Sequence, residues 1–137
     1  MKALIILFIL AAFDSYTVST AREAIEQIEM LCMFETNVTE SELRKFLTNG
    51  IKASEANLKL KCMMKCMMEK QGMFNNGVYN ATRAIQEMTS LPEMKGREDD
   101  IKKSVNGCKT EKGVNECDTA FKITMCLLEF KSRKHSS

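Results

Sequence analysis

The stretch from Leu58 to Gly72, LKLKCMMKCMMEKQG, decides how this chain folds. Its residues favour a helix, and Cys62 and Cys66 stand four apart, so both thiols project from one face, one turn apart. Parallel side chains one turn apart miss disulfide geometry, so each thiol is expected to pair with a different element. Apolar residues, mostly methionines, occupy the opposite face. A helix with two opposed uncharged faces is expected to be sandwiched, and we predict that this is the central helix.

The N-terminus has the features of a secretory signal peptide. Lys2 precedes an apolar run from Ala3 to Phe13, which small and polar residues follow. The run is too short to span a bilayer, although an uncleaved anchor is the alternative. We predict cleavage after Ala21, with residues 1–21 as signal peptide and 22–137 as one secreted, extracellular domain without membrane insertion.

Composition indicates a disulfide-rich helical protein. The chain of 137 residues has six cysteines, and an even count in an exported protein implies three disulfides. Eleven methionines, no tryptophan and a single proline favour an all-α domain with a pliable interior. The net charge is only +2, and the lysines are interleaved with acids, so no nucleic-acid partner is predicted.

The spacing of apolar residues predicts six helices. A capping box at Thr39 opens the second helix, Ser54 is expected to cap the central one, and Gly113 is expected to end the fifth. No β-alternation is visible, and residues 131–137 are expected to form a frayed polar tail. The predicted helices are Glu23 to Phe34, a short one stopped by Asn49-Gly50, Ser54 to Gly72, one through Ala81 and Met88 that ends before Leu91-Pro92, Glu98 to Gly113, and Asn115 to Phe130.

The cysteine spacing resembles that of a known family. Three residues separate Cys62 from Cys66, and eight separate Cys108 from Cys117 and Cys117 from Cys126. This is similar to the six-cysteine pattern of the insect odorant-binding proteins of the PBP/GOBP type, and the sequence around several of these cysteines is similar too. Spacing alone leaves 15 pairings open. The resemblance implies the bonds Cys32–Cys66, Cys62–Cys117 and Cys108–Cys126.

The resemblance also implies a compact six-helix domain with three interlocked disulfides around an internal apolar cavity. Helices three and four and the turn between them surround the family's cavity, so methionines there are expected to contact ligand. Tyr79, just after an Asn-Gly turn, is expected at the cavity edge, where its hydroxyl could hold a ligand's oxygen. The predicted ligand-binding residues, which would look the same as pure core residues, are Ile28, Met64, Met68, Met73, Tyr79, Ile85, Met88, Ile101, Val105, Ile123, Thr124 and Leu127.

Catalysis and metal binding find little support in the sequence. His135 is the only histidine, so no Ser-His-Asp arrangement can be built on the folded body, and we predict no enzyme and no cofactor. The alternative use of Cys62 and Cys66 is a zinc site, but no histidine stands near them, so no metal site is predicted. Sequons begin at Asn37 and Asn80, and glycosylation stays open because Thr39 of the first sequon and Asn80 of the second are also plausible helix-start residues.

The resemblance implies a secreted carrier that binds small hydrophobic ligands, such as odorants or pheromones, and transports them through aqueous extracellular fluid. A chemosensory receptor is a second implied partner, and the protein is expected to be a monomer or weak dimer. Two alternatives stay open. One is the same fold in a non-olfactory carrier role, and the other is a secreted helical signalling or defence protein with a solid core.

Overall fold

The computed structural model describes residues 23–135, with side chains described through Phe130. The chain divides into a first unit that ends at Leu31 and a second unit from Cys32 to Ser137. A helix over residues 23–36 crosses this boundary, two residues longer than the predicted first helix. The predicted signal peptide lies outside the described residues, and the domain limits stay a prediction.

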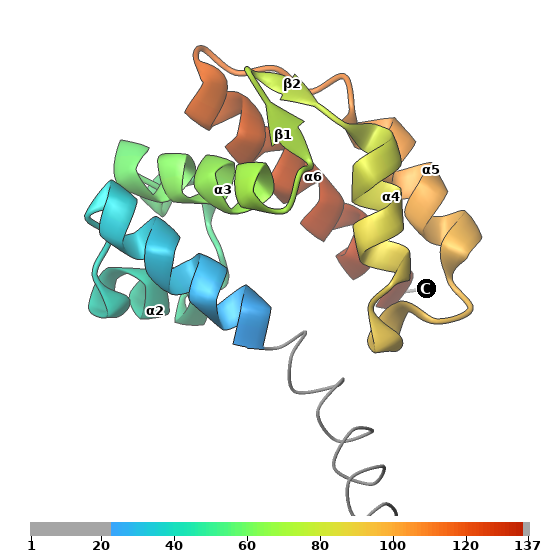
Figure 1. The fold of residues 1–137 in the computed structure, drawn as a ribbon, viewed down its shortest axis with the longest axis horizontal. Coiled ribbons are helices and arrows are strands. Elements are labelled where there is room, and N and C mark those ends of the chain that lie inside the picture. The colour runs from blue at the N-terminus through green and yellow to red at the C-terminus, as the bar shows by residue number, and fades with distance from the viewer. Residues whose placement is uncertain (1–22, 136–137) are drawn as a thin grey trace, which may run out of the picture. The chain divides into compact units, whose positions relative to one another are not determined.

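The described part of the chain is built almost wholly of helices, which confirms the predicted all-α class. The helix over residues 23–36 is followed by five further α-helices, two short 3-10 helices and one two-stranded ribbon (Figure 1). In order, these elements are α2 (Glu40–Thr48), η1 (Ala53–Glu55), α3 (Leu58–Lys70), β1 (Phe74–Asn75), β2 (Val78–Tyr79), α4 (Ala81–Thr89), η2 (Pro92–Met94), α5 (Glu98–Cys108) and α6 (Glu116–His135).

The antiparallel ribbon of β1 and β2 was not predicted from the sequence. Phe74 pairs with Tyr79, and the turn between the strands places Asn76 at φ 51° and Gly77 at φ 78°. Two successive positive φ angles are what a type I′ hairpin turn requires, and Asn-Gly is its preferred pair. Strands of two residues are too short for alternation to be visible, so only the turn itself could be predicted.

Helix starts were predicted correctly at α2 and incorrectly at α3. Thr39 accepts a hydrogen bond from the Glu42 backbone, and Glu42 accepts one from the Thr39 backbone, which completes the predicted capping box. Ser54 instead lies in η1, and the Asn57 side chain caps α3 by accepting from the Leu60 amide. Asparagine and serine are about equally good caps, so the sequence did not distinguish the two positions.

Two helix ends also differ from the prediction. The fifth helix ends at Cys108, five residues before Gly113, which lies in the loop before α6. Helix α6 continues past Phe130 to His135, so the predicted frayed tail is wrong for residues 131–135. The charged residues that follow Phe130 are good helix formers, and they extend a helix that packing has already nucleated.

Helix α3 packs against α6 over most of its length, and disulfides fix this pair to its surroundings (Figure 1). All six cysteines are paired, in the combination that the family resemblance implies: Cys32–Cys66, Cys62–Cys117 and Cys108–Cys126. The two thiols of α3 therefore reach two different partners, as their spacing requires. The third bond joins the end of α5 to the middle of α6.

The apolar interior of the second unit includes two clusters made wholly of described residues. The α3–α6 cluster consists of Met68, Phe74, Ala120 and Ile123, and the α4–α5 cluster consists of Ala84, Ile101 and Val105. Three half-buried side chains, Met73, Tyr79 and Leu127, pack against both clusters. These three residues therefore form the apolar connection between the α3–α6 pair and the α4–α5 pair.

Candidate functional site

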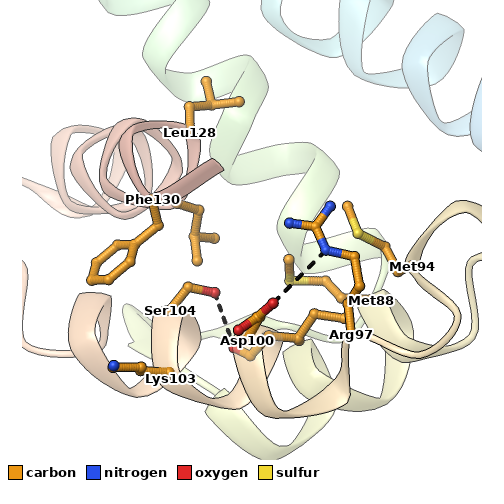
Figure 2. A pocket seen from close by; sticks show the side chains of 10 residues that line it. Met88, Met94, Arg97, Asp100, Lys103, Ser104, Leu128 and Phe130 are labelled. Carbon is orange, nitrogen blue, oxygen red and sulfur yellow. Dashed lines mark hydrogen bonds and ion pairs between the residues drawn. The ribbon is translucent and has the colours of Figure 1, made fainter. Parts of the chain in front are cut away.

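An apolar pocket of about 240 Å³ lies between α4, α5 and the last described turns of α6 (Figure 2). Its volume is slightly below the ~300–1,000 Å³ usual for ligand sites. Six of its lining residues are apolar, and the remaining four are polar and come from α5 or the residue before it. The lining residues are Met88, Met94, Ile101, Leu127, Leu128 and Phe130, with Arg97, Asp100, Lys103 and Ser104.

The helices present these side chains through simple periodicity. Arg97, Ile101 and Ser104 stand four and three residues apart, so they share one face of α5. Leu127 and Leu128 are consecutive residues of α6, and Phe130 lies two residues after Leu128 in the same helix. Met94 comes from η2, where Pro92 begins a short turn that returns the chain from α4 toward α5.

Tyr79 carries an unpartnered polar atom in the apolar interior next to this pocket. Its hydroxyl is buried and has no hydrogen-bond partner among the described residues. Burial raises the pKa of Tyr79 to about 12, so the phenol stays protonated and remains a hydrogen-bond donor at neutral pH. A buried polar group without a partner costs free energy, which a ligand oxygen at this position would recover.

Three of the twelve predicted ligand-binding residues line the pocket: Met88, Ile101 and Leu127. Six others belong to the two clusters or pack against them. The Thr124 hydroxyl donates to the Ala120 carbonyl at 2.9 Å and lies 3.7 Å from the Met68 sulfur. These six are Met68, Met73, Tyr79, Ile85, Val105 and Ile123.

Two predicted residues are not among those assigned to the pocket lining or the two clusters. Met64 is half-buried on α3 and belongs to neither cluster nor the pocket lining. Ile28 lies on the helix over residues 23–36, in the first unit. Its role in ligand binding stays a prediction.

Sequence reasoning missed seven residues of the lining: Met94, Arg97, Asp100, Lys103, Ser104, Leu128 and Phe130. The signal for Arg97 and Ser104 was present, because both share a helical face with Ile101. Only the apolar member of that face, Ile101, was predicted to contact ligand. Met94 gave no periodic signal, since it stands in a three-residue turn after Pro92.

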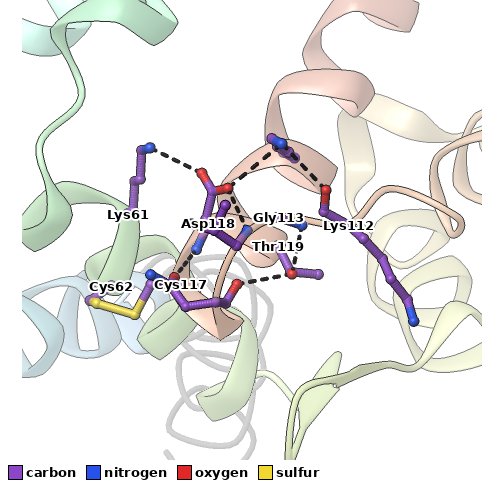
Figure 3. A network of polar contacts seen from close by, with 10 residues as sticks. Lys61, Cys62, Lys112, Gly113, Cys117, Asp118 and Thr119 are labelled. Atoms are coloured by element: carbon purple, nitrogen blue, oxygen red, sulfur yellow. Dashed lines mark hydrogen bonds and ion pairs between the residues drawn. A yellow bond between two sulfur atoms is a disulfide. The ribbon is translucent and has the colours of Figure 1, made fainter.

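The opposite end of α6 holds a polar network (Figure 3). Asp118 is buried and accepts hydrogen bonds from Lys61 at 3.0 Å and from the Val114 amide at 3.0 Å. The Lys61 and Val114 bonds hold the pKa of Asp118 below its usual range, against the effect of burial. The Nζ of Lys122 lies 3.6 Å from the same carboxylate. Cys117, which precedes Asp118 in the chain, forms the disulfide with Cys62. This network holds α3, α6 and the preceding loop together.

Comparison with known proteins identifies the family. The model of the PBP/GOBP family matches residues 14–130, which is most of the chain. The chain belongs to the PBP/GOBP family. The chain is also 30% identical to general odorant-binding protein 56a of Drosophila melanogaster, over 73% of this chain and 68% of that protein. It is 26% identical to general odorant-binding protein 69a of the same fly, over 80% of this chain and 70% of the relative.

Solved structures of family members share the fold. The fatty acid binding protein OBP56a from the oral disk of the blowfly Phormia regina is 25% identical, with a TM-score of 0.68 over 83% of this chain and 94% of that one. Odorant-binding protein OBP28a of Drosophila melanogaster superposes with a TM-score of 0.68 at 16% identity, over 85% of this chain and 96% of that one. These homologues and structural neighbours are odorant-binding proteins, a family of secreted carriers of small hydrophobic ligands.

Within residues 23–135, no helix has both the length and the apolar character needed to cross a membrane.

Proposed function

We propose that this protein is a secreted carrier that binds a small hydrophobic molecule in the pocket between α4, α5 and α6. The observation that carries the proposal is Leu127, which lines the pocket and also packs against both apolar clusters. A ligand chain that enters the pocket therefore contacts side chains continuous with the interior of the protein.

Binding rests on burial of apolar surface. At about 0.8 kcal/mol per methylene, a ten-carbon chain gains roughly 8 kcal/mol before any cost is counted. Ordering the ligand and losing its translational freedom offset several kcal/mol of this gain. Micromolar affinity, about −8 kcal/mol, therefore needs good packing together with a polar contact.

Flexible side chains suit such a pocket. Met88 and Met94 line it, and Met73 packs against the cluster behind it. Methionine thioethers adapt to ligands of different shape, and apolar pockets discriminate only weakly by size. The Tyr79 hydroxyl supports the same proposal, because a chain that reaches it supplies the acceptor that this donor lacks.

The test is displacement of a fluorescent apolar probe by aliphatic alcohols and esters. Leu127→Glu should abolish probe binding, because it places an unpaired carboxylate in the apolar lining of the pocket. Leu47→Glu is the matched control, since it makes the same chemical change at a half-exposed position of α2 away from the pocket, and it should bind normally. Circular dichroism must show that both variants are folded.

Two results of the probe experiment would contradict this proposal. Equal probe binding by folded Leu127→Glu and by the unmodified protein would remove this pocket as the site. Failure of the unmodified protein to bind any apolar probe would favour the alternative of a signalling or defence protein with a solid core.

A second carrier role, outside olfaction, is favoured by one comparison. The blowfly relative comes from the oral disk and is named as a fatty acid binding protein. Tissue of expression distinguishes a role in feeding or lipid transport from one in olfaction. The proposed contact with a chemosensory receptor and the monomeric or weakly dimeric state stay predictions.

A further inference from the structure

The loop between the helix over residues 23–36 and α2 contains a motif that ligand binding does not use. One of the chain's two Asn-X-Thr sequons begins at Asn37, and the other begins at Asn80. The asparagine of such a sequon accepts N-linked carbohydrate when it lies in a surface loop of an exported protein. The structure distinguishes the two sequons by this requirement.

The first sequon lies wholly outside the helices. Asn37 and Thr39 are both exposed, and the backbone of Thr39 is extended, at φ −84° and ψ 156°. In the second sequon only Asn80 precedes α4, and the two residues after it belong to the first turn of that helix. The Oδ1 of Asn80 also caps α4, since it accepts a hydrogen bond from the Arg83 amide at 3.0 Å. The first sequon therefore has the loop conformation that the modification needs, and the second does not.

The side-chain amide of Asn37 is available for modification. Asn37 has a left-handed backbone, with φ 58°, because it ends the helix over residues 23–36 in a Schellman motif, in which the Val38 amide bonds to the Met33 carbonyl at 3.0 Å. Lys59 contacts only the backbone carbonyl of Asn37, at 3.4 Å. Within residues 23–135 no hydrogen bond engages the Asn37 side chain, so its Nδ2 can carry a substituent.

An exposed phenylalanine stands one turn before this amide. Phe34 is 84% exposed, and its carbonyl accepts a hydrogen bond from the Asn37 backbone amide at 3.5 Å. The two side chains between them are engaged elsewhere. Glu35 accepts a hydrogen bond from Lys70 at 2.9 Å, and the Thr36 hydroxyl donates to a backbone carbonyl of its own helix at 2.6 Å. An apolar ring thus lies exposed next to a free amide.

We propose that Asn37 is an N-glycosylation site and that the first sugar of its glycan packs on the Phe34 ring. In the reaction, the Nδ2 of Asn37 loses a proton to water and forms a bond to C1 of the N-acetylglucosamine of a lipid-linked oligosaccharide. The bond between this carbon and the pyrophosphate oxygen breaks, and the lipid pyrophosphate leaves with the electron pair. The donor belongs to the secretory pathway, the same oxidising route that the three disulfides require.

Contact between the sugar and the ring is physically favourable. A pyranose has a face of C–H groups, and the negative face of an aromatic ring attracts such partially positive hydrogens. The sugar also removes the apolar Phe34 ring from water while its own hydroxyls stay hydrated. Thr39 still caps α2 by accepting from the Glu42 amide, because the glycan is attached to Asn37. The folded structure therefore accommodates the modification.

The experiment expresses the full chain in cultured mammalian cells and maps the secreted protein by mass spectrometry, before and after treatment with peptide-N-glycosidase F. This enzyme converts a glycosylated asparagine to aspartate, so position 37 should become aspartate and Asn80 should stay asparagine. Asn37→Asp should abolish the glycan. Thr82→Ala is the matched control, because it destroys the second sequon at an exposed position without removing the Asn80 cap, and it should leave the glycan in place.

Thermal unfolding tests the contact with Phe34. Enzymatic removal of the glycan should lower the unfolding temperature of the chain without substitutions by a few degrees, because the ring is exposed again. In Phe34→Ala the same treatment should cause a much smaller shift, since no ring is left for the sugar to cover. The four forms make a double-mutant cycle, which isolates the contact between the sugar and the ring.

The inference is overturned if the secreted protein carries no glycan on Asn37, or if Asn80 is modified as fully as Asn37. Equal shifts with and without the Phe34 ring would show that the sugar does not pack on it. None of these results bears on the carrier function, because Asn37 does not line the pocket, and probe affinity should be the same before and after removal of the glycan.

Discussion

The two ends of α6 are held in opposite ways. At the stapled end, defined by Cys117, Asp118 and their partners on α3, a disulfide, a buried carboxylate and fully buried side chains fix the helix (Figure 3). At the pocket end, Leu127, Leu128 and Phe130 are only half-buried and line an open volume (Figure 2).

This difference in packing between the two ends indicates how one helix contributes both to stability and to ligand binding. A wall that must accept ligands of different shape cannot be tightly packed, because close packing leaves no room and resists distortion. The stapled end supplies the stability that the pocket end gives up. Four predictions test this division, beginning with the largest expected effect.

Removal of the Cys62–Cys117 bond should cause the largest loss of stability. The bond closes a loop of 55 residues, for which the chain-entropy model predicts about 4 kcal/mol, against about 3 kcal/mol for the 18-residue separation of Cys108–Cys126. Urea unfolding of the two double Cys→Ser variants measures this order. Probe affinity should show the reverse order, because Cys108–Cys126 joins α5 and α6, two of the three helices that line the pocket. A larger loss of probe binding in the Cys62–Cys117 variant, while folded, would contradict the division.

Truncation of a core side chain should be costly at the stapled end and mild at the pocket end. Ile123 is fully buried in the α3–α6 cluster, so Ile123→Ala should lower the free energy of unfolding by about 2–5 kcal/mol. Leu128 is half-buried in the pocket lining, so Leu128→Ala should cost about 1 kcal/mol. Equal losses in urea unfolding would show that the pocket end is packed as firmly as the core.

Two glycines provide a finer comparison. A Cβ at Gly113 would lie 2.6 Å from the Asp118 backbone carbon, which cannot move without distorting α6, so Gly113→Ala should destabilise by about 1–3 kcal/mol. A Cβ at Gly107 would meet only the Phe130 ring, at 3.0 Å. That ring can shift within the pocket, and alanine favours the helix by about 0.5–1 kcal/mol, so Gly107→Ala should be close to neutral. If Gly107→Ala lowers the thermal unfolding temperature as much as Gly113→Ala does, Phe130 is held rigidly.

The smallest effect should appear in the pH dependence of the stapled end. Because the pKa of Asp118 is lowered from its usual 3.8 on folding, its ionised form contributes stability above that pH, and the contribution is lost as the pH falls below it. Asp118→Asn should therefore lower stability at neutral pH and flatten the acid side of the curve. Asp99→Asn, at an exposed position of α5, is the control and should keep the slope of the unmodified protein.

If the stability of Asp118→Asn falls with decreasing pH as steeply as that of the unmodified protein, Asp118 is not a source of the acid sensitivity. Glu42 does not obscure the test, because it is present in all three proteins. Its hydrogen bonds from the Thr39 backbone and Lys59 lower its pKa to about 2.

The sequence by itself determined the helical architecture and the stapling of α3. Cysteines four apart on one helix cannot pair with each other, and apolar spacing places a helix wherever it recurs, because both follow from local geometry. The capping box at Thr39 and the turn at Asn76-Gly77 were readable for the same reason, since each depends on residues only a few positions apart.

Only the tertiary structure decided which residues form the pocket. Met64 and Met68 stand on the same helix with the same chemistry, yet Met68 joins the α3–α6 cluster and Met64 does not. The place of Arg97 in the pocket lining, together with Leu127 and Phe130, depends on α6, which lies far from it in sequence. The sequence around an apolar or charged side chain does not specify which distant helix will contact it. Burial of apolar surface is non-directional, so the contact depends on how the whole domain packs.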